Sequence, residues 1–335
     1  MKKTSIKIDK DSGSPIYRQI IAAVCSDIED GVLTQGSMLR SVNEIADENG
    51  LSRDSVFKAY NELRAMGLIQ SVPGKGYFIT STNIKKKEKI FFLLDEFSDY
   101  KKQLFENFGK SIGNSAAVDL FFHNYNIQVM DSLIKGAVGS YTKYVVWPVM
   151  TPKVKNILKQ IPANKLYIVD AGVEWYFGEY PGVYQDYAAD ITTLFMKNIR
   201  LFRNYKKITL VFPERLLLYE IQRGFEQFLK DSGMRGTIVS DGTKIKAAKG
   251  EAYFVIDDED LVHLVNEGQA KGLRLGHDFG VIAYNETPLK SIAAGGITVL
   301  SSDFGRMGTL LAELMKNKKK KSIRNPSDLF VRGSL

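Results

Sequence analysis

Apolar residues between positions 39 and 78 recur first at the spacing of helices and then at the spacing of strands. Ser41 precedes one apolar face, and Glu44, three residues later, completes the capping-box pattern that marks a helix start. Gly50 ends this first helix in a tight turn, and Ser52 opens a second helix with a similar apolar face. The pattern therefore predicts a helix, a short turn and a second helix.

Further elements are expected on both sides of these two helices. Upstream, Ser14 is a candidate helix cap, and Pro15 suits the first position of a supporting helix. Downstream, the β-prone segments LIQS and YFIT flank the turn sequence PGKG at residues 73–76, which predicts a hairpin with a basic tip. A helix-turn-helix followed by such a hairpin is a winged helix-turn-helix, an α+β head that we assign to residues 1–80.

The polar residues of this head suit a nucleic-acid partner. The first turn of the second helix carries hydroxyl groups, the forked guanidinium of Arg53 and the charge of Lys58, which can contact bases and phosphates in a major groove. On the hairpin, glycines let the backbone approach a phosphate while Lys75 adds charge. For each residue taken singly, a helix cap or a solvated charge is the alternative. The predicted DNA contacts are Arg40, Ser41, Ser52, Arg53, Ser55, Lys58, Gly74, Lys75, Gly76 and Tyr77.

Several short motifs of the head occur together: a leading helix in SPIYRQI, the segment L-x-S-x-x-E-I-A, the helix start S-R-x-S-V and the hairpin G-x-G-Y-F. With these motifs, residues 15–80 resemble the GntR family of bacterial transcriptional regulators. The resemblance implies that Ser41, Arg53, Ser55, Lys75 and Gly76 contact DNA. Arg40 stands where the family usually has Pro, Asn43 where it usually has Arg, and Phe57 where it often has Arg. The operator sequence therefore does not follow from the family.

From Ile90 onward, apolar runs of strand length alternate with amphipathic helical stretches. Runs such as IFFLL, LYIVD, ITLVF and YFVID are separated by segments such as DITTLFMKNIRLF and YEIQRGFEQFLKDSG. This alternation predicts an α/β domain with a mainly parallel, doubly wound sheet over residues 90–335. Residues 81–89 are polar and lysine-rich without apolar periodicity, and we interpret them as a linker.

Polar and aromatic residues near the ends of these runs form a candidate ligand site. In doubly wound sheets, ligands bind beyond the carboxyl ends of the strands. A polyhydroxylated ligand needs carboxylates and amides for hydrogen bonds and flat aromatic side chains for its apolar faces. The alternatives are a helix cap or turn for each Asp and core packing for each aromatic ring. The candidate effector-binding residues are Asp95, Tyr100, Trp147, Trp175, Tyr176, Asp186, Glu220, Asp258 and Asn285.

A series of motifs spans almost all of this second domain: VYQDYAAD before a long helix, then RGFEQF, FVIDDEDL, VIAYNE and ITVLSSDFGRMG. In order and spacing they resemble the periplasmic-binding-protein-type effector domain of LacI/GalR regulators. The resemblance implies a two-lobed domain that closes on a ligand, side-by-side dimerisation, and sugar binding by Asp186 and Asp258. Asn285 falls where an Asp is usual. Ile221 replaces a sugar-binding Arg, for which Glu220 is a partial substitute.

Composition bears on the number of domains, the kind of partner and the cellular location. A chain of 335 residues with 44% hydrophobic residues is long enough for two domains with substantial cores. The formal net charge of +8 suits a polyanionic partner. The single cysteine, Cys25, excludes an internal disulfide and is interpreted as a buried thiol. No apolar stretch is long enough to span a membrane, and no apolar signal core follows the basic N-terminus, so we expect a cytoplasmic protein.

The sequence is compatible with three functions. The first is a dimeric regulator that reads a two-fold operator in double-stranded DNA and responds to a small carbohydrate. Its resemblance to arabinose-responsive regulators implies a pentose or deoxyhexose such as arabinose or fucose, and a non-sugar metabolite is the alternative. The second is an enzyme fusion, but His123, His263 and His277 lack catalytic or metal-ligand spacing. The third is a cytoplasmic small-molecule-binding protein. We expect no enzyme activity, no cofactor and no metal.

Overall fold

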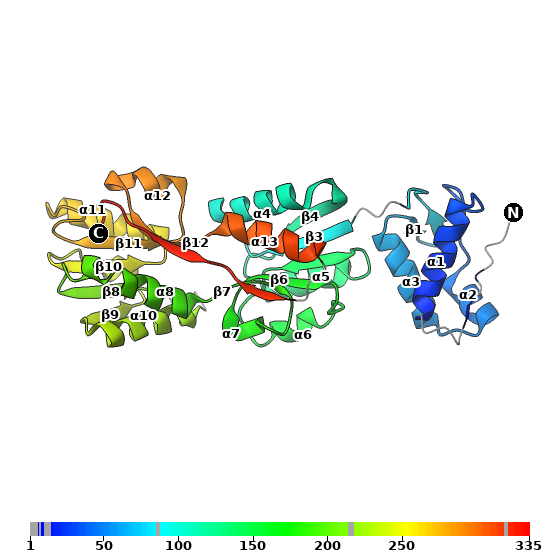
Figure 1. The fold of residues 1–335 in the computed structure, drawn as a ribbon, viewed down its shortest axis with the longest axis horizontal. Helices are drawn as coiled ribbons and strands as arrows, with labels where there is room; N and C mark the ends of the chain where they lie inside the picture. Colours follow the sequence, from blue (N-terminus) through cyan, green and yellow to red (C-terminus); the bar gives the residue numbers. More distant parts are fainter. Residues whose placement is uncertain (1–5, 7, 10–14, 85–87, 214–217, 318–320) are drawn as a thin grey trace. The chain divides into compact units, whose positions relative to one another are not determined.

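The computed structural model describes residues 6, 8–9, 15–84, 88–213, 218–317 and 321–335, and Figure 1 traces them along the chain. The chain divides into two compact units. One comprises residues 1–96, 112–149 and 153–167, and the other comprises residues 97–111, 150–152 and 168–335. The predicted linker lies partly outside the described residues, so the domain boundaries at residues 80 and 90 stay predictions.

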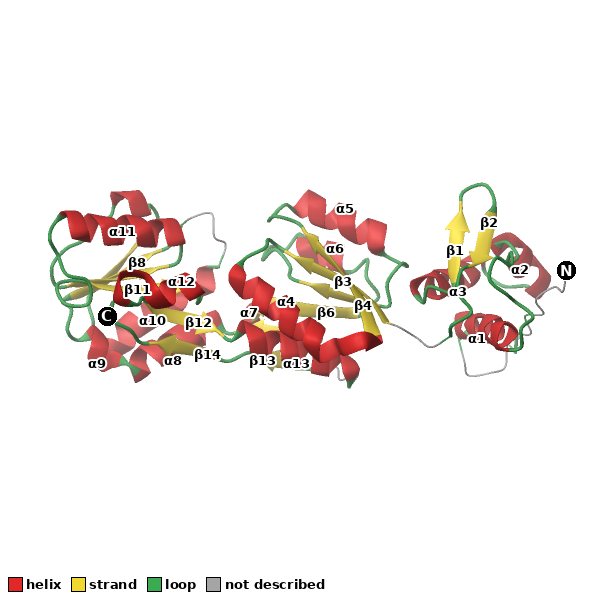
Figure 2. Cartoon of the chain, turned by 90° about the horizontal axis from the view of Figure 1, so that it is seen from above, coloured by secondary structure: helices red, strands yellow, loops and turns green. Residues whose placement is uncertain are grey.

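The described part of the head contains helices followed by an antiparallel hairpin (Figure 2). Its elements are α1 (Ile16–Glu29), α2 (Val42–Asn49), α3 (Arg53–Ala65), β1 (Ile69–Val72) and β2 (Gly76–Ile79). The Ser41 hydroxyl accepts a hydrogen bond from the Glu44 backbone, and the Glu44 carboxylate accepts one from the Ser41 backbone. This capping box starts α2, and Gly50 ends it in the left-handed conformation. The winged helix-turn-helix prediction is confirmed.

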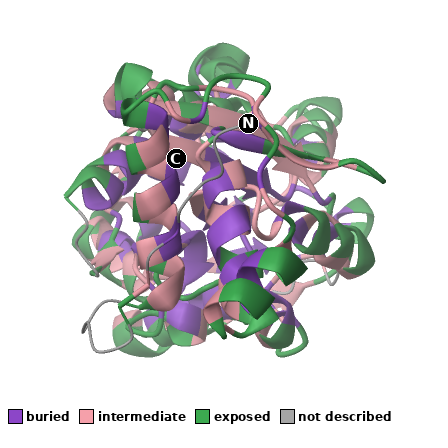
Figure 3. Cartoon of the chain, turned by 90° about the vertical axis from the view of Figure 1, so that its right-hand side faces the viewer, coloured by how far each residue is buried: buried purple, intermediate pink, exposed green. Residues whose placement is uncertain are grey.

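The three helices of the head pack around one apolar core. Ile20 of α1 and Val56 and Leu63 of α3 are fully buried in it. The helices are buried along their inner sides and exposed along their outer sides (Figure 3). Helix α1 begins at Ile16, one residue later than predicted, and the predicted cap Ser14 lies outside the described residues.

A six-stranded sheet with the order β13-β7-β6-β5-β3-β4 forms one lobe of the larger domain. The pairs described within it, such as β3 with β4 and β6 with β7, are parallel. Its strands are β3 (Glu88–Leu94), β4 (Ala116–Phe122), β5 (Lys143–Val146), β6 (Leu166–Gly172), β7 (Gly182–Gln185) and β13 (Ser322–Arg324). The helices in these parts of the chain are α4 (Asp99–Ile112), α5 (Ile127–Ala137), α6 (Val154–Leu158), α7 (Val173–Tyr176) and α13 (Phe304–Lys316).

A second six-stranded sheet has the order β14-β12-β11-β10-β8-β9, and the pairs described within it are parallel except β12 with β14. Its strands are β8 (Lys207–Val211), β9 (Gly236–Val239), β10 (Glu251–Val255), β11 (Gly280–Tyr284), β12 (Thr298–Ser302) and β14 (Ser327–Phe330). Its helices are α8 (Tyr187–Lys197), α9 (Ile199–Phe202), α10 (Tyr219–Ser232), α11 (Asp258–Ala270) and α12 (Pro288–Ile292). Short 3₁₀ turns lie at Gly113–Ser115, Gly242–Lys244 and Ala293–Gly295.

The alternation of strands and helices confirms the predicted two-lobed, mainly parallel α/β fold. Residues such as Phe195 of α8, Phe254 of β10 and Ile282 of β11 fill the core between the second sheet and its helices. Such apolar runs are buried on both faces because helices cover the sheet. In the described ranges, no helix has both the length and the apolar character that crossing a membrane requires.

The chain passes from one sheet to the other after β7, after β12 and after β13 (Figure 1). Polar contacts join these crossing segments. The Asn325 backbone donates to the carbonyl of Tyr184, and the Asp303 backbone donates to the carbonyl of Pro326. The segment after β13 therefore bonds both to the end of β7 and to the segment after β12.

Candidate DNA-binding and effector-binding sites

The first turn of α3 exposes polar groups at a helix N-terminus. The Ser52 hydroxyl accepts a hydrogen bond from the Ser55 backbone and lies 2.8 Å from the Ser55 hydroxyl. Arg53 and Lys58 are exposed, and the Lys58 ammonium lies 4.2 Å from the centre of the Tyr17 ring. This turn combines a helix N-terminus, hydroxyls and cations, which suits a phosphate or a base edge.

The tip of the hairpin brings a cation next to accessible backbone. Gly74 and Gly76 adopt positive φ angles of 72° and 106°, which favour glycine over residues with a side chain. The exposed Lys75 lies between them, and its backbone donates to the Val72 carbonyl at 3.0 Å. The turn therefore has the open backbone and the charge that the sequence predicted for a phosphate contact.

Arg40, Ser41 and Tyr77, which were also predicted to contact DNA, have structural partners within the head. Arg40 forms an ion pair with Glu48, and its carbonyl accepts a 2.6 Å hydrogen bond from Tyr60. Ser41 belongs to the capping box of α2. The Tyr77 ring packs edge-on against Tyr60 with centroids 4.7 Å apart. These contacts explain the three residues without DNA, so their predicted DNA contacts stay predictions.

Two of the predicted effector-binding residues, Asp95 and Trp147, lie at the carboxyl edge of the first sheet. Asp95 follows β3 and Trp147 follows β5, and both are buried. His123, which follows β4, is fully buried, with Nε2 2.9 Å from the Trp147 carbonyl. Sequence reasoning did not include His123 in the site, although its place directly after an apolar run was the available signal.

Trp175 and Glu220 contact each other. Nε1 of Trp175 donates a 2.9 Å hydrogen bond to Oε1 of Glu220, and the neighbouring Glu174 forms an ion pair with Arg223. These contacts join α7 to α10. Burial of Tyr176 raises the pKa of its phenol above the ordinary value, and Tyr100 packs against Phe304 with ring centroids 4.7 Å apart. Core packing therefore accounts for much of the surface of these two tyrosines.

Asp258 and Asn285 lie around the ammonium group of Lys290 at the carboxyl edge of the second sheet. Lys290 is only 5% exposed, and its Nζ lies 2.7 Å from Oδ1 of Asp258. The same ammonium donates 2.8 Å hydrogen bonds to the carbonyls of Tyr284 and Asn285. Asn285 has a φ of 58°, and among the described residues its buried Oδ1 has no hydrogen-bond partner. Lys290 was absent from the predicted site because nothing in its spacing distinguishes it from a surface lysine.

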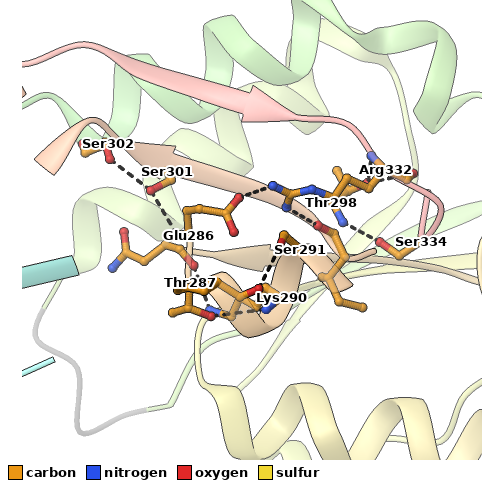
Figure 4. A network of polar contacts seen from close by, with 12 residues as sticks. Glu286, Thr287, Lys290, Ser291, Thr298, Ser301, Ser302, Arg332 and Ser334 are labelled. Atoms are coloured by element: carbon orange, nitrogen blue, oxygen red, sulfur yellow. Dashed lines mark hydrogen bonds and ion pairs between the residues drawn. The ribbon is translucent and has the colours of Figure 1, made fainter. Parts of the chain in front are cut away.

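A network next to Lys290 anchors the end of the chain to β11 and β12 (Figure 4). Arg332 forms an ion pair with Glu286, and the Glu286 backbone donates to Ser301 at 3.0 Å. The Ser334 hydroxyl accepts a 2.7 Å hydrogen bond from the Thr298 backbone. These contacts fix the loop after β11 that carries Asn285 and leads to Lys290 of α12.

Asp186 lies at the first crossing between the sheets. Its carboxylate caps α8 by accepting a hydrogen bond from the Ala189 backbone, and its other oxygen lies 2.8 Å from the Arg324 guanidinium. Gln185, the preceding residue, is buried and donates a hydrogen bond to Asp170. The structure thus gives Asp186 a capping role, the alternative that the sequence left open, and its sugar-binding role stays a prediction.

Metal-binding geometry is not present in the described ranges, where no group of three or more His, Cys, Asp or Glu side chains is placed to hold a metal ion. Cys25 is partly buried against the core of the head.

These features define a winged helix-turn-helix head joined to an α/β domain with two mainly parallel sheets. Residues 16–79 match the family model described as bacterial regulatory proteins of the gntR family. The head is therefore a helix-turn-helix domain of the gntR family.

Named relatives match the head. The transcriptional repressor YtrA of Bacillus subtilis is 37% identical over 75 residues, 22% of this chain and 58% of that protein. The repressor STM4068 of Salmonella typhimurium is 36% identical over 76 residues, 23% of this chain and 32% of that protein. The repressor NagR of Bacillus subtilis is 32% identical over 81 residues, 24% of this chain and 33% of that protein. The chain thus covers between 32% and 58% of the length of these relatives.

Solved structures match about three quarters of the chain. A dimeric Lac repressor has a TM-score of 0.62 and 14% identity, over 73% of this chain and 98% of that chain. A LacI-family regulator from Enterococcus faecium with bound ribose has a TM-score of 0.59 and 16% identity, over 74% and 98%. One from Lactobacillus casei with bound glucose has a TM-score of 0.60 and 13% identity, over 74% and 99%. The larger domain therefore has the fold of LacI-family regulators.

Proposed function

We propose that this chain is a transcriptional regulator that binds operator DNA through residues 1–80 and senses a small carbohydrate through residues 90–335, with 81–89 as the linker. The observation that carries this proposal is a gntR-family winged head in the same chain as a domain with the LacI-family fold. A ligand that favours one arrangement of the larger domain changes the affinity for DNA through linkage. Such a regulator acts in the cytoplasm, where we propose that this protein is located.

The exposed groups of the head support DNA as its partner. Arg53 and Lys58 on α3 and Lys75 on the hairpin are exposed cations, and Ser52 adds a hydroxyl at the helix start. In a helix-turn-helix, the start of the second helix meets the base edges. We assign sequence reading to Arg53 at the start of α3 and phosphate binding to Lys58 and Lys75.

Side chains in the loops and helices that follow the strands support a carbohydrate effector. Asn285 offers an amide, Asp258 and Glu220 offer carboxylates, and Trp175 offers an indole ring. Sugars require hydrogen-bonding partners of this kind together with flat apolar side chains. The structures from Lactobacillus casei and Enterococcus faecium that share the fold contain glucose and ribose. We propose a pentose or deoxyhexose such as arabinose or fucose.

A homodimer is the proposed assembly, because a two-fold protein matches a two-fold operator. Leu289 and Ile292 of α12 are 72% and 74% exposed and lie three residues apart, so they share one face of that helix. We propose that this face contacts a second copy of the chain, as Lac repressor structures with this fold are described as dimeric. Sedimentation of the wild type and of Leu289→Asp tests this: the variant should sediment as a monomer.

The function is tested in two steps. First, a thermal-shift screen with monosaccharides and sugar phosphates looks for a ligand that raises the melting temperature, because a ligand that binds only the folded state stabilises it by mass action. Second, the affinity for duplexes from the promoter region of its own gene is measured with and without that ligand. A sugar that changes both the melting temperature and the affinity for DNA supports the proposal. Failure to bind any duplex would overturn the regulator assignment. If the protein binds DNA but no sugar raises its melting temperature, the effector belongs to another chemical class.

A further inference from the structure

Helix α3 carries a large apolar ring on its exposed face. Val56, Ala59 and Leu63 of this helix are buried in the core of the head, but the Phe57 side chain is 50% exposed. Phe57 therefore contributes little to the core, and a polar residue there would cost the fold little. The exposed half of the ring is available for contact with a partner outside the head.

The surroundings of Phe57 indicate the chemistry of that partner. Phe57 lies four residues after Arg53, one helical turn, so the two side chains project from the same face of α3. The neighbouring Lys58 is also exposed, and Ser52 caps the same helix. The start of α3 carries the cations Arg53 and Lys58 and one acid, Asp54, so its net charge is positive. A second copy of this chain would bring the same positive charge against this face, whereas a polyanion complements it.

DNA presents a suitable apolar group in its major groove. Each base pair shows hydrogen-bond donors and acceptors there, and the C5-methyl group of thymine is the apolar element, which apolar side chains such as Phe can contact. A guanidinium at this position would donate to guanine, but a phenyl ring has no donor. The ring therefore changes which base the helix can read.

We propose that Phe57 contacts the C5-methyl group of a thymine in each half-site of the operator and so helps to set base preference. The proposal rests on the DNA-binding function proposed above and adds a residue and a base to it. Arg53 then supplies the polar contact one turn earlier on the same face, and Phe57 excludes water from the methyl group. Burying one methyl group corresponds to about a fourfold gain in affinity per half-site.

Deoxyuridine tests the proposal directly, because it lacks the C5-methyl group of thymine but has the same hydrogen-bonding edge. Duplexes are selected from a random pool with the full-length wild-type protein, and each conserved thymine is then replaced by deoxyuridine. One thymine per half-site should prove sensitive, with about fourfold weaker wild-type binding on replacement. Phe57→Ala should bind the thymine and deoxyuridine duplexes with equal affinity, because the ring that distinguishes them is gone.

Lys58→Ala provides the matched control on the adjacent exposed position. It should weaken binding to every duplex and still discriminate thymine from deoxyuridine, because a phosphate contact carries no base information. The melting temperature and sedimentation of Phe57→Ala should equal those of the wild type, since the ring is not part of the core.

Three results would overturn the proposal. Wild-type protein that is indifferent to every deoxyuridine substitution does not read a methyl group. Phe57→Ala that discriminates as well as the wild type means that another residue reads it. A change of sedimentation in Phe57→Ala would mean that the ring contacts a second protein copy. If the wild type selects no duplex at all, the proposed DNA-binding function itself fails, and that outcome is distinct from the other three.

Discussion

The hydroxyl of Ser327 donates a 2.6 Å hydrogen bond to Oδ2 of Asp190, and this contact joins strand β14 to helix α8. Ser327 lies 3.0 Å from the hydroxyl of Ser302, which in turn donates to the side chain of Gln185. These residues lie close to the segments where the chain crosses between its sheets. The crossings are thus held by side-chain hydrogen bonds in addition to the backbone contacts.

Replacing Asp190 should stabilise the protein at neutral pH. Burial raises the pKa of the Asp190 carboxyl to about 6, although the Ser327 hydrogen bond opposes the rise. The folded state therefore holds a proton that the unfolded state releases, and stability falls as pH rises from about 4 to about 6. Asp190→Asn keeps the acceptor for Ser327 but cannot ionise. Its free energy of unfolding at pH 7 should exceed that of the wild type by on the order of 3 kcal/mol, and the difference should vanish near pH 4. Urea unfolding across this pH range measures it.

Asp241→Asn is the control, because it should change the stability at neutral pH in the opposite direction. Hydrogen bonds from Lys244 and Thr243 lower the pKa of Asp241 to about 2, so its ionised form stabilises the fold above the unfolded pKa. That variant should lose stability at neutral pH and approach the wild type as pH falls. An unchanged pH dependence in Asp190→Asn would mean that Asp190 does not titrate near pH 6 in the folded state.

Alanine substitutions at two glycines, one on helix α13 and one on helix α4, should change the free energy of unfolding in opposite directions. A Cβ at Gly308 would lie 2.2 Å from the backbone oxygen of Leu104, so the two helices would have to separate. Gly308→Ala should therefore destabilise the protein by about 2 kcal/mol. A Cβ at Gly109 meets nothing within 4 Å, and Gly109→Ala should stabilise by about 0.5 to 1 kcal/mol through helix propensity. Urea unfolding of both variants at one pH compares them, and equal effects would contradict the close packing at Gly308.

Removing the guanidinium of Arg53 should separate the two proposed functions. Arg53→Ala should weaken operator binding by about 1 to 3 kcal/mol, because a base or phosphate contact at the start of α3 is lost. Ligand-induced stabilisation should stay at the wild-type value. Arg200→Ala, which removes an equal charge from an exposed position on α9, should leave operator binding unchanged. Parallel loss of DNA and ligand binding in Arg53→Ala would show that the two functions do not belong to separate parts of the chain.

The head was predictable from sequence because its signals are local. The capping box of Ser41 and Glu44, the left-handed Gly50 and the glycines at the hairpin tip all act within a few residues. The alternation of apolar runs with amphipathic segments likewise predicted the parallel sheets. The short strand β13 was not predicted, because its parallel pairing with β7 joins residues more than a hundred positions apart.

Contacts of the candidate effector site were less predictable than the fold. The sequence indicated Asp258, Glu220 and Trp175 one at a time. In the structure Asp258 contacts Lys290, and Trp175 contacts Glu220, so each contact joins separate segments of the chain. Spacing in the sequence carries no information on such pairs. Lysine side chains are usually exposed, so the burial of Lys290 could not be expected from its residue type. One carboxylate and two carbonyl acceptors compensate for the burial of its charge.

Asp258→Ala should abolish the response to the effector and spare basal operator binding. Its carboxylate is mostly exposed, so one oxygen pairs with Lys290 while the group stays accessible to a ligand. The loss of the pair should cost about 1 to 3 kcal/mol in stability, because the buried Lys290 ammonium then keeps only its two carbonyl acceptors. Glu259→Ala removes the same charge from the same turn of α11 and should keep the response. Operator affinity is measured by fluorescence anisotropy with and without the sugar identified by thermal shift. A normal response in Asp258→Ala would remove this residue from the site and leave Trp175, Glu220 and Asn285 to be tested in the same way.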